Sequence, residues 1–281
     1  MEQLNNLKHF NIAQVLECGQ VFRFNKDKHN DFILVAGNKK IKICQQADSI
    51  IIKNSTPEDI SKVWKTYFDL DTNYEDITNI LMNKDEHMSK IVQFGEGIRI
   101  LRQDPWEMLI SFIISQNKAI PHIKTCIENI CLNYGTPIDS LTHAFPTVNQ
   151  LMNVTDEQLR ECKVGFRAGY IIDATKKVFN GEIDLENIKT MGINEARIEL
   201  MKIKGVGPKI ADCILLFAYN KMDVFPTDVW IKRMIEGLYF NGQDTKLDKI
   251  QKFAKEYFGE LAGYAQQYLF FYGRENGMFK K

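Results

Sequence analysis

Residues 201–228, which read MKIKGVGPKIADCILLFAYNKMDVFPTD, constrain the fold more than any other stretch of the sequence. Gly205 and Gly207 permit positive φ angles and a close approach of the backbone to another surface. Pro208 suits the first position of a helix, because its missing N–H would have no helical partner there. The pattern predicts two helices joined by a tight turn. Unpaired backbone N–H groups at such a turn and helix start form a site for an anion.

Two ionisable residues accompany this turn. Lys209 falls in the first turn of the second helix, where a cation opposes the helix dipole by roughly 0.3–1 kcal/mol. The same field, with apolar neighbours such as Ile210, favours the neutral amine, which is a nucleophile. Asp228 occupies the N-cap position of the next helix. Taken singly, a Gly-x-Gly turn and a capping aspartate are more often structural. If the helices pack side by side, however, an amine and a carboxylate meet beside a phosphate-binding turn.

Other site classes find little support in the sequence. GVGPKIAD lacks the third glycine of a dinucleotide-binding motif, and GVGPK does not match G-x-x-x-x-G-K-[ST]. The six cysteines form no C-x-x-C pair, so neither a zinc site nor a redox motif is expected. No 18-residue apolar run is present, and MEQLNNLKHF lacks the order of a signal peptide. We therefore expect a cytoplasmic protein without a membrane partner.

The charge distribution gives only a weak indication of a partner. The chain of 281 residues has 36 basic and 36 acidic side chains, so its formal net charge is zero. Residues 196–235 nevertheless contain seven Lys and Arg against four Asp and Glu, whereas residues 56–90 contain four against eight. A basic segment in a neutral protein is compatible with DNA binding.

The pattern of apolar residues predicts an α+β protein. Residues 18–24 are a strand candidate, and residues 32–36 and 41–44 form a hairpin candidate around Gly37, with a further strand at 49–53. Helical periodicity then continues almost to the C-terminus. We expect an N-terminal antiparallel β domain with attached helices at 1–98. An all-helical body at 99–281 follows, with a helix-hairpin-helix at about 196–220 and the active site in a cleft between helical subdomains.

LMKIKGVGPKIADC followed by VFPTDVW resembles the helix-hairpin-helix and Gly/Pro-Asp element of a superfamily of base-excision DNA glycosylases. The spacing of Lys209 and Asp228, with Cys213 between them, is similar to that of the 8-oxoguanine DNA glycosylase/AP lyase family. The segments CGQVFRF, LRQDPWEMLISFI, GFRAGY and GYAQQYLFFYGRE also have family counterparts, so the resemblance spans nearly the whole chain. Related glycosylases with an iron–sulfur cluster carry four cysteines near the C-terminus. No cysteine follows Cys213, so we expect no cluster and no other cofactor.

The resemblance implies roles for particular residues. In the family a lysine attacks the deoxyribose C1′ and forms a Schiff base, and an aspartate stabilises the cationic sugar; Lys209 and Asp228 match them. The implied lesion pocket consists of Gly19, Cys213, Gln266 and Phe270. Gln266 and Phe270 are four residues apart on one predicted helix, so they share a face. The implied substrate is double-stranded DNA containing 8-oxoguanine, bound by a monomer without an obligate protein partner.

Contacts to the rest of the duplex are also implied. Asn117 and Arg167 match an asparagine and an arginine that hold the opposite cytosine, and Phe166 matches the aromatic that fills the gap left by the flipped base. His122 replaces a second arginine of the animal-type members. A histidine offers fewer donors and is largely neutral at pH 7, so we expect weaker discrimination between opposite bases. The backbone N–H groups of the hairpin residues are expected to bind one DNA phosphate; these residues are Gly205, Val206 and Gly207.

Two alternative functions stay open at this point. An alkylated-base DNA glycosylase can share the β domain and the helical body, but it relies on the aspartate without a lysine nucleophile, which Lys209 argues against. A non-catalytic helix-hairpin-helix DNA-binding protein needs only the glycines, which would leave the pair Lys209 and Asp228 unexplained.

Overall fold

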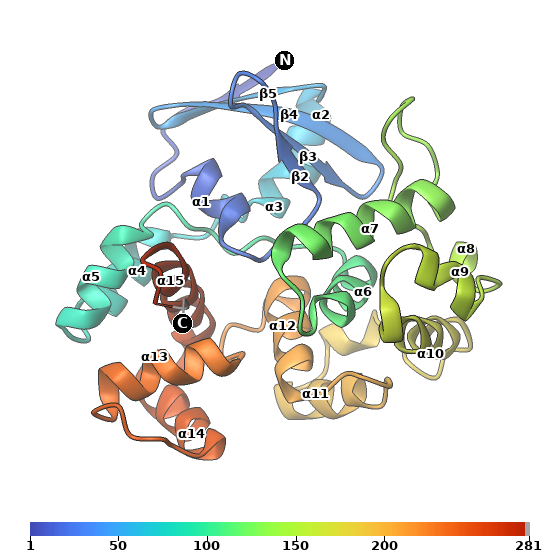
Figure 1. The fold of residues 1–281 in the computed structure, drawn as a ribbon. Coiled ribbons are helices and arrows are strands. Elements are labelled where there is room, and N and C mark those ends of the chain that lie inside the picture. Colours follow the sequence, from blue (N-terminus) through green and yellow to red (C-terminus); the bar gives the residue numbers. More distant parts are fainter. Residues whose placement is uncertain (279–281) are drawn as a thin grey trace.

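The computed structural model describes residues 1–278 and has the predicted α+β architecture (Figure 1). An antiparallel sheet of five strands lies at one end of the molecule, in the order β1-β5-β4-β3-β2. The sheet is a meander of neighbouring hairpins, to which the N-terminal strand adds beside the last one. Its strands are β1 Glu2–Leu4, β2 Phe24–Lys26, β3 Phe32–Ala36, β4 Lys39–Gln46 and β5 Ser49–Lys53.

The sheet confirms one strand prediction and corrects another. Ala36 pairs with Lys39 across the predicted turn, so the hairpin of β3 and β4 is confirmed. Of the strand candidate at 18–24, only Phe24 lies in a strand. The preceding residues form a loop, because Gly19 has a φ of +88° and the buried amide of Gln20 bonds the carbonyls of Val15 and Arg99 instead of a neighbouring strand.

Helices make up the rest of the described chain, apart from connecting loops (Figure 1). The N-terminal half contains α1 Ile12–Glu17, α2 Pro57–Asp59, the π-helical η1 Ile60–Trp64, α3 Lys65–Tyr67, α4 Tyr74–Met82, α5 Glu86–Phe94, α6 Pro105–Ser115 and α7 Ile120–Tyr134. The C-terminal half contains α8 Val148–Leu151, α9 Asp156–Glu161, η2 Gly165–Arg167, α10 Ala168–Phe179, η3 Asn187–Lys189, α11 Ile193–Met201, α12 Pro208–Tyr219, α13 Val229–Tyr239, α14 Leu247–Phe258, η4 Gly259–Leu261 and α15 Ala262–Glu275.

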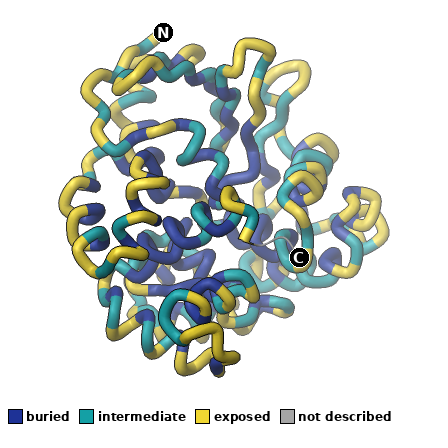
Figure 2. Tube along the Cα trace, turned by 60° about the vertical axis from the view of Figure 1, so that its left-hand side comes forward, coloured by how far each residue is buried: buried dark blue, intermediate teal, exposed yellow. Residues whose placement is uncertain are grey.

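Two hydrophobic cores organise the molecule, and buried residues gather inside both parts (Figure 2). The sheet covers a core that includes Leu16, Leu34 and Trp64. The second core lies among the helices, and it includes Leu81 of α4 and Met88 of α5. Helix α5 packs against α15. The first of the helices expected to accompany the sheet therefore share their core with the C-terminal helix.

The buried side chain of Arg23 joins the two parts. Its Nε donates to Glu128 of α7 at 3.0 Å, and its Nη2 donates to the carbonyl of His143 at 2.6 Å. Since a buried guanidinium requires such partners, these bonds fix the sheet against α7. That arrangement brings the loop after α1 close to the helical body.

Candidate active site

The helix-hairpin-helix is formed by α11 and α12, and its two glycines serve different purposes. Gly205 has a φ of +83°, and a Cβ there would lie 2.3 Å from the ring of Tyr170. A side chain at Gly205 is therefore excluded by the backbone conformation and by packing. Gly207 has a φ of −97°, and a Cβ there would meet no atom within 4 Å. Gly207 thus lies at an open surface, where its lack of a side chain leaves room for a second molecule.

The structure corrects the prediction for Val206. This residue is buried, and its backbone N–H donates to the carbonyl of Ile203 at 3.0 Å. Because that amide closes the hairpin, it is already engaged and does not point to a phosphate. The predicted phosphate site is therefore reduced to the amides of Gly205 and Gly207 together with the first turn of α12.

Lys209 and Asp228 line one cavity of about 610 Å³. Lys209 lies in the first turn of α12, with its Nζ 5.9 Å from the ring centroid of Phe112. Asp228 caps α13 as predicted, since its Oδ1 accepts from the backbone N–H groups of Trp230 at 2.9 Å and Ile231 at 2.8 Å. The cap fixes the carboxylate on a helix N-terminus and leaves Oδ2 outside both capping bonds. An amine and a fixed carboxylate thus face the same space.

Cys213 lies one turn beyond Lys209 on α12 and is buried. Burial raises the pKa of its thiol, and the nearby Lys209 only partly offsets this effect. The thiol therefore stays protonated at neutral pH, and a protonated thiol is a poor nucleophile. This leaves the amine as the nucleophile of the cavity, with Cys213 beside it as a small apolar surface.

The lesion-pocket residues predicted on the C-terminal helix lie together with Gly19. A Cβ on Gly19 would lie 2.8 Å from Cε1 of Phe270, so the ring rests against the glycine backbone. Gln266, one turn before Phe270 on α15, is buried, and its Oε1 has no hydrogen-bond partner among the described residues. An unsatisfied buried amide oxygen is costly, and the N–H group of a bound base would satisfy it.

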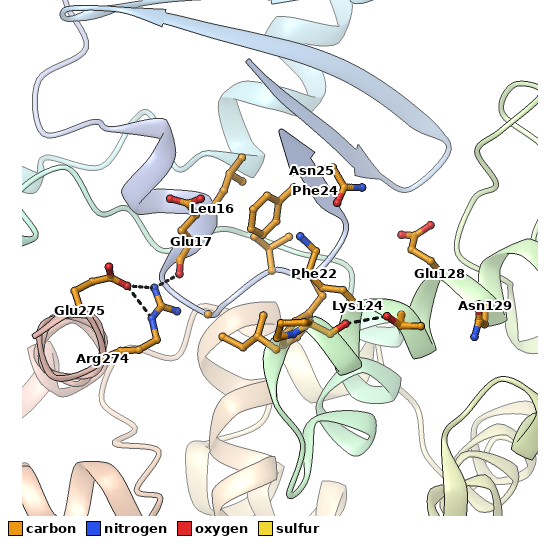
Figure 3. Close-up of a pocket in the computed structure, with 15 residues that line it drawn as sticks. Leu16, Glu17, Phe22, Phe24, Asn25, Lys124, Glu128, Asn129, Arg274 and Glu275 are labelled. Atoms are coloured by element: carbon orange, nitrogen blue, oxygen red, sulfur yellow. Dashed lines mark hydrogen bonds and ion pairs between the residues drawn. The ribbon is translucent and has the colours of Figure 1, made fainter. Parts of the chain in front are cut away.

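A second cavity, of about 820 Å³, opens beside Gly19 (Figure 3). Residues 115–119 line the catalytic cavity, whereas Ile120, Pro121 and Lys124 of α7 line this one. The start of α7 therefore separates the two cavities. A space of this volume accommodates a purine base. Cys213 and Gln266 are buried and line neither cavity.

The sequence analysis missed two cations of this second cavity. Arg274 pairs with Glu275 at 2.8 Å and donates to the carbonyl of Glu17, which holds α15 against the loop of Gly19 (Figure 3). Lys124 places its Nζ 3.8 Å from the ring centroid of Phe24. Arg274 could have been found, because it lies four residues beyond Phe270 and continues the face of Gln266 and Phe270. Lys124 has no such signal.

The residues expected to contact the opposite base and the gap lie on two neighbouring turns. Asn117 is exposed in the turn between α6 and α7, has a φ of +51° and lines the catalytic cavity. Phe166 is 55% exposed at η2, as an intercalating side chain requires. Its ring lies edge-on to Tyr170, which in turn covers Gly205. The wedge candidate is thus joined to the hairpin.

Arg167 does not have the exposure that the sequence indicated. Only 4% of it is exposed, its guanidinium stacks 4.3 Å from the ring of Phe166, and its donors reach the carbonyls of Val164 and Gln116. Its Nε has no partner among the described residues. In this conformation Arg167 positions the turn that carries Asn117 and does not project from the surface, because two backbone carbonyls hold it inside.

His122 is exposed on the first turn of α7 and has a cationic neighbour that the sequence analysis overlooked. Lys118 places its Nζ 3.1 Å from Nε2 of His122 and 3.1 Å from the carbonyl of Lys163. Positive charge is therefore available beside the histidine, but on a flexible ammonium and not on a planar guanidinium.

No metal site accompanies these residues within 1–278, where no group of three or more His, Cys, Asp or Glu side chains could hold an ion. All six cysteines are free. No helix in the same range is long and apolar enough to cross a membrane.

Comparison with known proteins agrees with this geometry. The model of the N-terminal domain of 8-oxoguanine DNA glycosylase matches residues 3–109, and that of the HhH-GPD superfamily of base excision DNA repair proteins matches residues 110–260. A probable N-glycosylase/DNA lyase of Methanothermobacter thermautotrophicus is 33% identical over 234 residues, which cover 75% of this chain and 74% of the relative. An N-glycosylase/DNA lyase of Saccharomyces cerevisiae is 33% identical over 81% of this chain and 68% of its own length.

A solved structure matches almost the entire chain. The 8-oxoguanine glycosylase/lyase of Clostridium acetobutylicum, in complex with double-stranded DNA containing cytosine opposite 8-oxoguanine, has a TM-score of 0.94 and 43% sequence identity. The match covers 98% of this chain and 95% of that chain. The family models, the relatives and the shared structure lead to one conclusion: the chain belongs to the HhH-GPD superfamily and, within it, to the 8-oxoguanine DNA glycosylase family of N-glycosylase/DNA lyases.

Proposed function

We propose that the protein repairs oxidised guanine in duplex DNA as an 8-oxoguanine DNA glycosylase with AP lyase activity. The observation that carries this function is the shared cavity of Lys209 and Asp228 in a chain of the N-glycosylase/DNA lyase family. A base inside a duplex is closed to attack at its sugar, so the nucleotide must turn out of the stack, at a cost of a few kcal/mol. The exposed Phe166 is suited to fill the gap that it leaves.

The first chemical step is displacement of the base. The Nζ lone pair of Lys209 forms a bond to C1′ while the C1′–N9 bond breaks, and the bonding electrons leave with the base, which takes up a proton. Positive charge develops on the sugar during this step. The capped carboxylate of Asp228 lies on the same cavity and stabilises that charge without having to reorient.

The second step nicks the strand. Opening of the sugar ring gives a Schiff base between C1′ and Lys209, and this imine acidifies the C2′ proton. Loss of that proton forms a C2′–C3′ double bond, while the C3′–O bond breaks and the phosphate leaves. This β-elimination requires an amine nucleophile, which accounts for a lysine at the start of α12.

Selection of the lesion is assigned to the pocket beside Gly19. The carbonyl of Gly19 is suited to accept the N7–H that distinguishes 8-oxoguanine from guanine. The unsatisfied Oε1 of Gln266 supports a role in reading the hydrogen-bonding edge of the base. Phe270, against Gly19, supplies a ring for stacking. Asn117 at the catalytic cavity is suited to hold the opposite cytosine.

An excision assay separates this function from its alternatives. Duplexes carrying 8-oxoguanine, an alkylated purine or no lesion are incubated with the protein, and released base and nicked strand are measured separately. We expect release of 8-oxoguanine together with strand nicking. Release of the alkylated base alone, or binding without release, would instead support the alkylated-base glycosylase or the non-catalytic protein.

A further inference from the structure

The catalytic cavity contains one aromatic side chain among the residues that line it, that of Trp230. The other lining residues are polar or aliphatic: Ser115, Gln116, Asn117, Lys118, Ala119, Lys209, Ile210 and Asp228. Trp230 lies in the first turn of α13, and its backbone N–H donates to Oδ1 of Asp228 at 2.9 Å. The same residue thus holds the catalytic carboxylate through its backbone and lines the reaction space with its side chain.

Arg233 accompanies this indole one turn later on α13. Its guanidinium carbon lies 5.0 Å from the centroid of the indole ring. Arg233 is exposed, and among the described residues no carboxylate lies within ion-pair distance of it. An arginine stacked on an aromatic ring is held in place while its N–H donors stay available. Those donors are therefore open to an anion at the edge of the cavity.

We propose that Trp230 and Arg233 form a clamp for the flipped nucleotide. The indole packs against the deoxyribose, and Arg233 binds a phosphate next to it. The argument rests on the proposed function, because Lys209 reaches C1′ only if the sugar occupies this cavity. The phosphates attached to that sugar then lie at the mouth of the cavity, where Arg233 offers a partner for an anion.

The indole has a chemical consequence for the Schiff base. Water that reaches C1′ adds to the imine, releases Lys209 and leaves an aldehyde, so that the strand is not nicked. A broad apolar ring against the sugar excludes this water. The clamp therefore raises the share of turnovers that proceed to β-elimination. A residue with a purely structural role would not change that share.

Tryptophan fluorescence tests contact with the nucleotide directly. Trp64 and Trp106 are 0% and 8% exposed, whereas Trp230 is only partly buried, so it reports on a ligand in the cavity. The probes are a duplex with a tetrahydrofuran abasic analogue and the matching undamaged duplex. We expect a change in emission with the analogue that the Trp230→Phe variant lacks. Unchanged emission of the unmodified protein at saturating analogue would overturn the proposal.

Single-turnover kinetics on an 8-oxoguanine duplex test the role of the indole. We expect Trp230→Ala to slow base release roughly tenfold, as loss of an aromatic stacking partner does. The same variant should lower the ratio of nicked strand to released base, and Trp230→Phe should restore most of both. Trp230→Ala with an unchanged rate and an unchanged ratio would refute the clamp. If the unmodified protein releases no 8-oxoguanine, it is the proposed function that fails.

Arg233→Gln tests the phosphate contact, with Lys249→Gln as its matched control. Lys249 is also an exposed cation beside a ring, 5.1 Å from the centroid of Phe240, but it does not line the cavity. We expect Arg233→Gln to reduce the salt dependence of lesion binding by about one counterion. Lys249→Gln should leave it unchanged. Equal salt dependence in Arg233→Gln and the unmodified protein would contradict the assignment.

Discussion

The sheet and the catalytic cleft treat their cations in opposite ways. In the sheet, Lys39 pairs with Asp59 at 2.7 Å, Lys40 with Asp139 at 2.8 Å, and Lys42 with Asp31 at 2.9 Å. At the cleft, no carboxylate in the described chain lies within ion-pair distance of the lysines and arginine that line or flank the catalytic cavity: Lys118, Lys209 and Arg233.

This difference explains how a chain of zero net charge can bind DNA. The acids that balance the total charge are placed on the lysines of the sheet and on the outer helices, whereas the cations at the cleft have no counterion of their own in the described structure. DNA phosphates are suited to be those counterions. Net charge is therefore a poor guide to partners when acids and bases are segregated on the surface.

Removing the carboxylate at the cleft is expected to have the largest effect. Asparagine also caps helices, so Asp228→Asn keeps α13 in place while removing the negative charge beside the sugar. We expect the single-turnover rate of base release to fall by roughly 10²–10³-fold, as when a charge-stabilising group is lost. The matched change in the sheet, Asp59→Asn, should leave the rate unchanged. A rate within threefold of the unmodified protein for Asp228→Asn would break the contrast between the regions.

An unpaired acid at the junction of the two regions gives a pH-dependent effect. Burial raises the pKa of Glu107 to about 7, and Arg23 only partly offsets this. Because the folded protein holds the proton more tightly, the associated stability is complete below about pH 4.5 and is lost as the pH rises through about 7.

Glu107→Gln removes that loss. We expect the variant to unfold with a free energy up to about 3 kcal/mol higher than the unmodified protein at pH 8, and nearly equal at pH 5. Denaturant unfolding at both pH values measures the difference. The same difference at pH 5 and pH 8 would show that the carboxyl does not titrate in this range.

Gly207→Val tests the phosphate site of the hairpin. Because a Cβ at Gly207 meets no protein atom and its φ is ordinary, the variant should fold normally. Added bulk should keep a phosphate from the amides at this open surface, at a cost of about 1.5–3 kcal/mol for a charged hydrogen bond. We expect roughly tenfold or greater loss of binding to damaged and undamaged duplex alike. Loss of lesion binding alone would place the contact elsewhere.

His122→Arg adds a guanidinium to the cleft and is expected to have the smallest effect. Each bidentate base contact contributes roughly 1–3 kcal/mol of discrimination. We therefore expect the unmodified protein to excise 8-oxoguanine opposite cytosine with only modest preference, and the variant to sharpen that preference by about tenfold. Single-turnover rates opposite C, A, G and T measure it. A strong cytosine preference before any substitution would contradict this account of His122.

Residues whose backbone conformation or spacing is dictated locally could be predicted from the sequence. The hairpin after Ile203, the cap at Asp228 and the shared face of Gln266 and Phe270 follow from turn chemistry and helical periodicity. They are also the positions where the structure agrees with expectation.

Positions that depend on distant segments could not be predicted. Arg167 was expected at the surface, but the carbonyl of Gln116, fifty-one residues away, holds it inside. Val206 stands in a turn that looks fully open, yet its amide closes the hairpin itself. Arg23 and Glu107 have no sequence motif, because their burial arises only when the sheet docks on the helices. Long-range packing overrides local pattern at these sites.

The central claim is that Lys209 is the nucleophile, and borohydride trapping tests it most directly. The protein is incubated with an 8-oxoguanine duplex and sodium borohydride, which reduces a Schiff base to a stable covalent adduct. Lys204→Gln is the matched control, since Lys204 is an exposed lysine on the same hairpin. We predict an adduct with the unmodified protein and with Lys204→Gln, and none with Lys209→Gln. An adduct of equal yield with Lys209→Gln would contradict the assignment of the nucleophile.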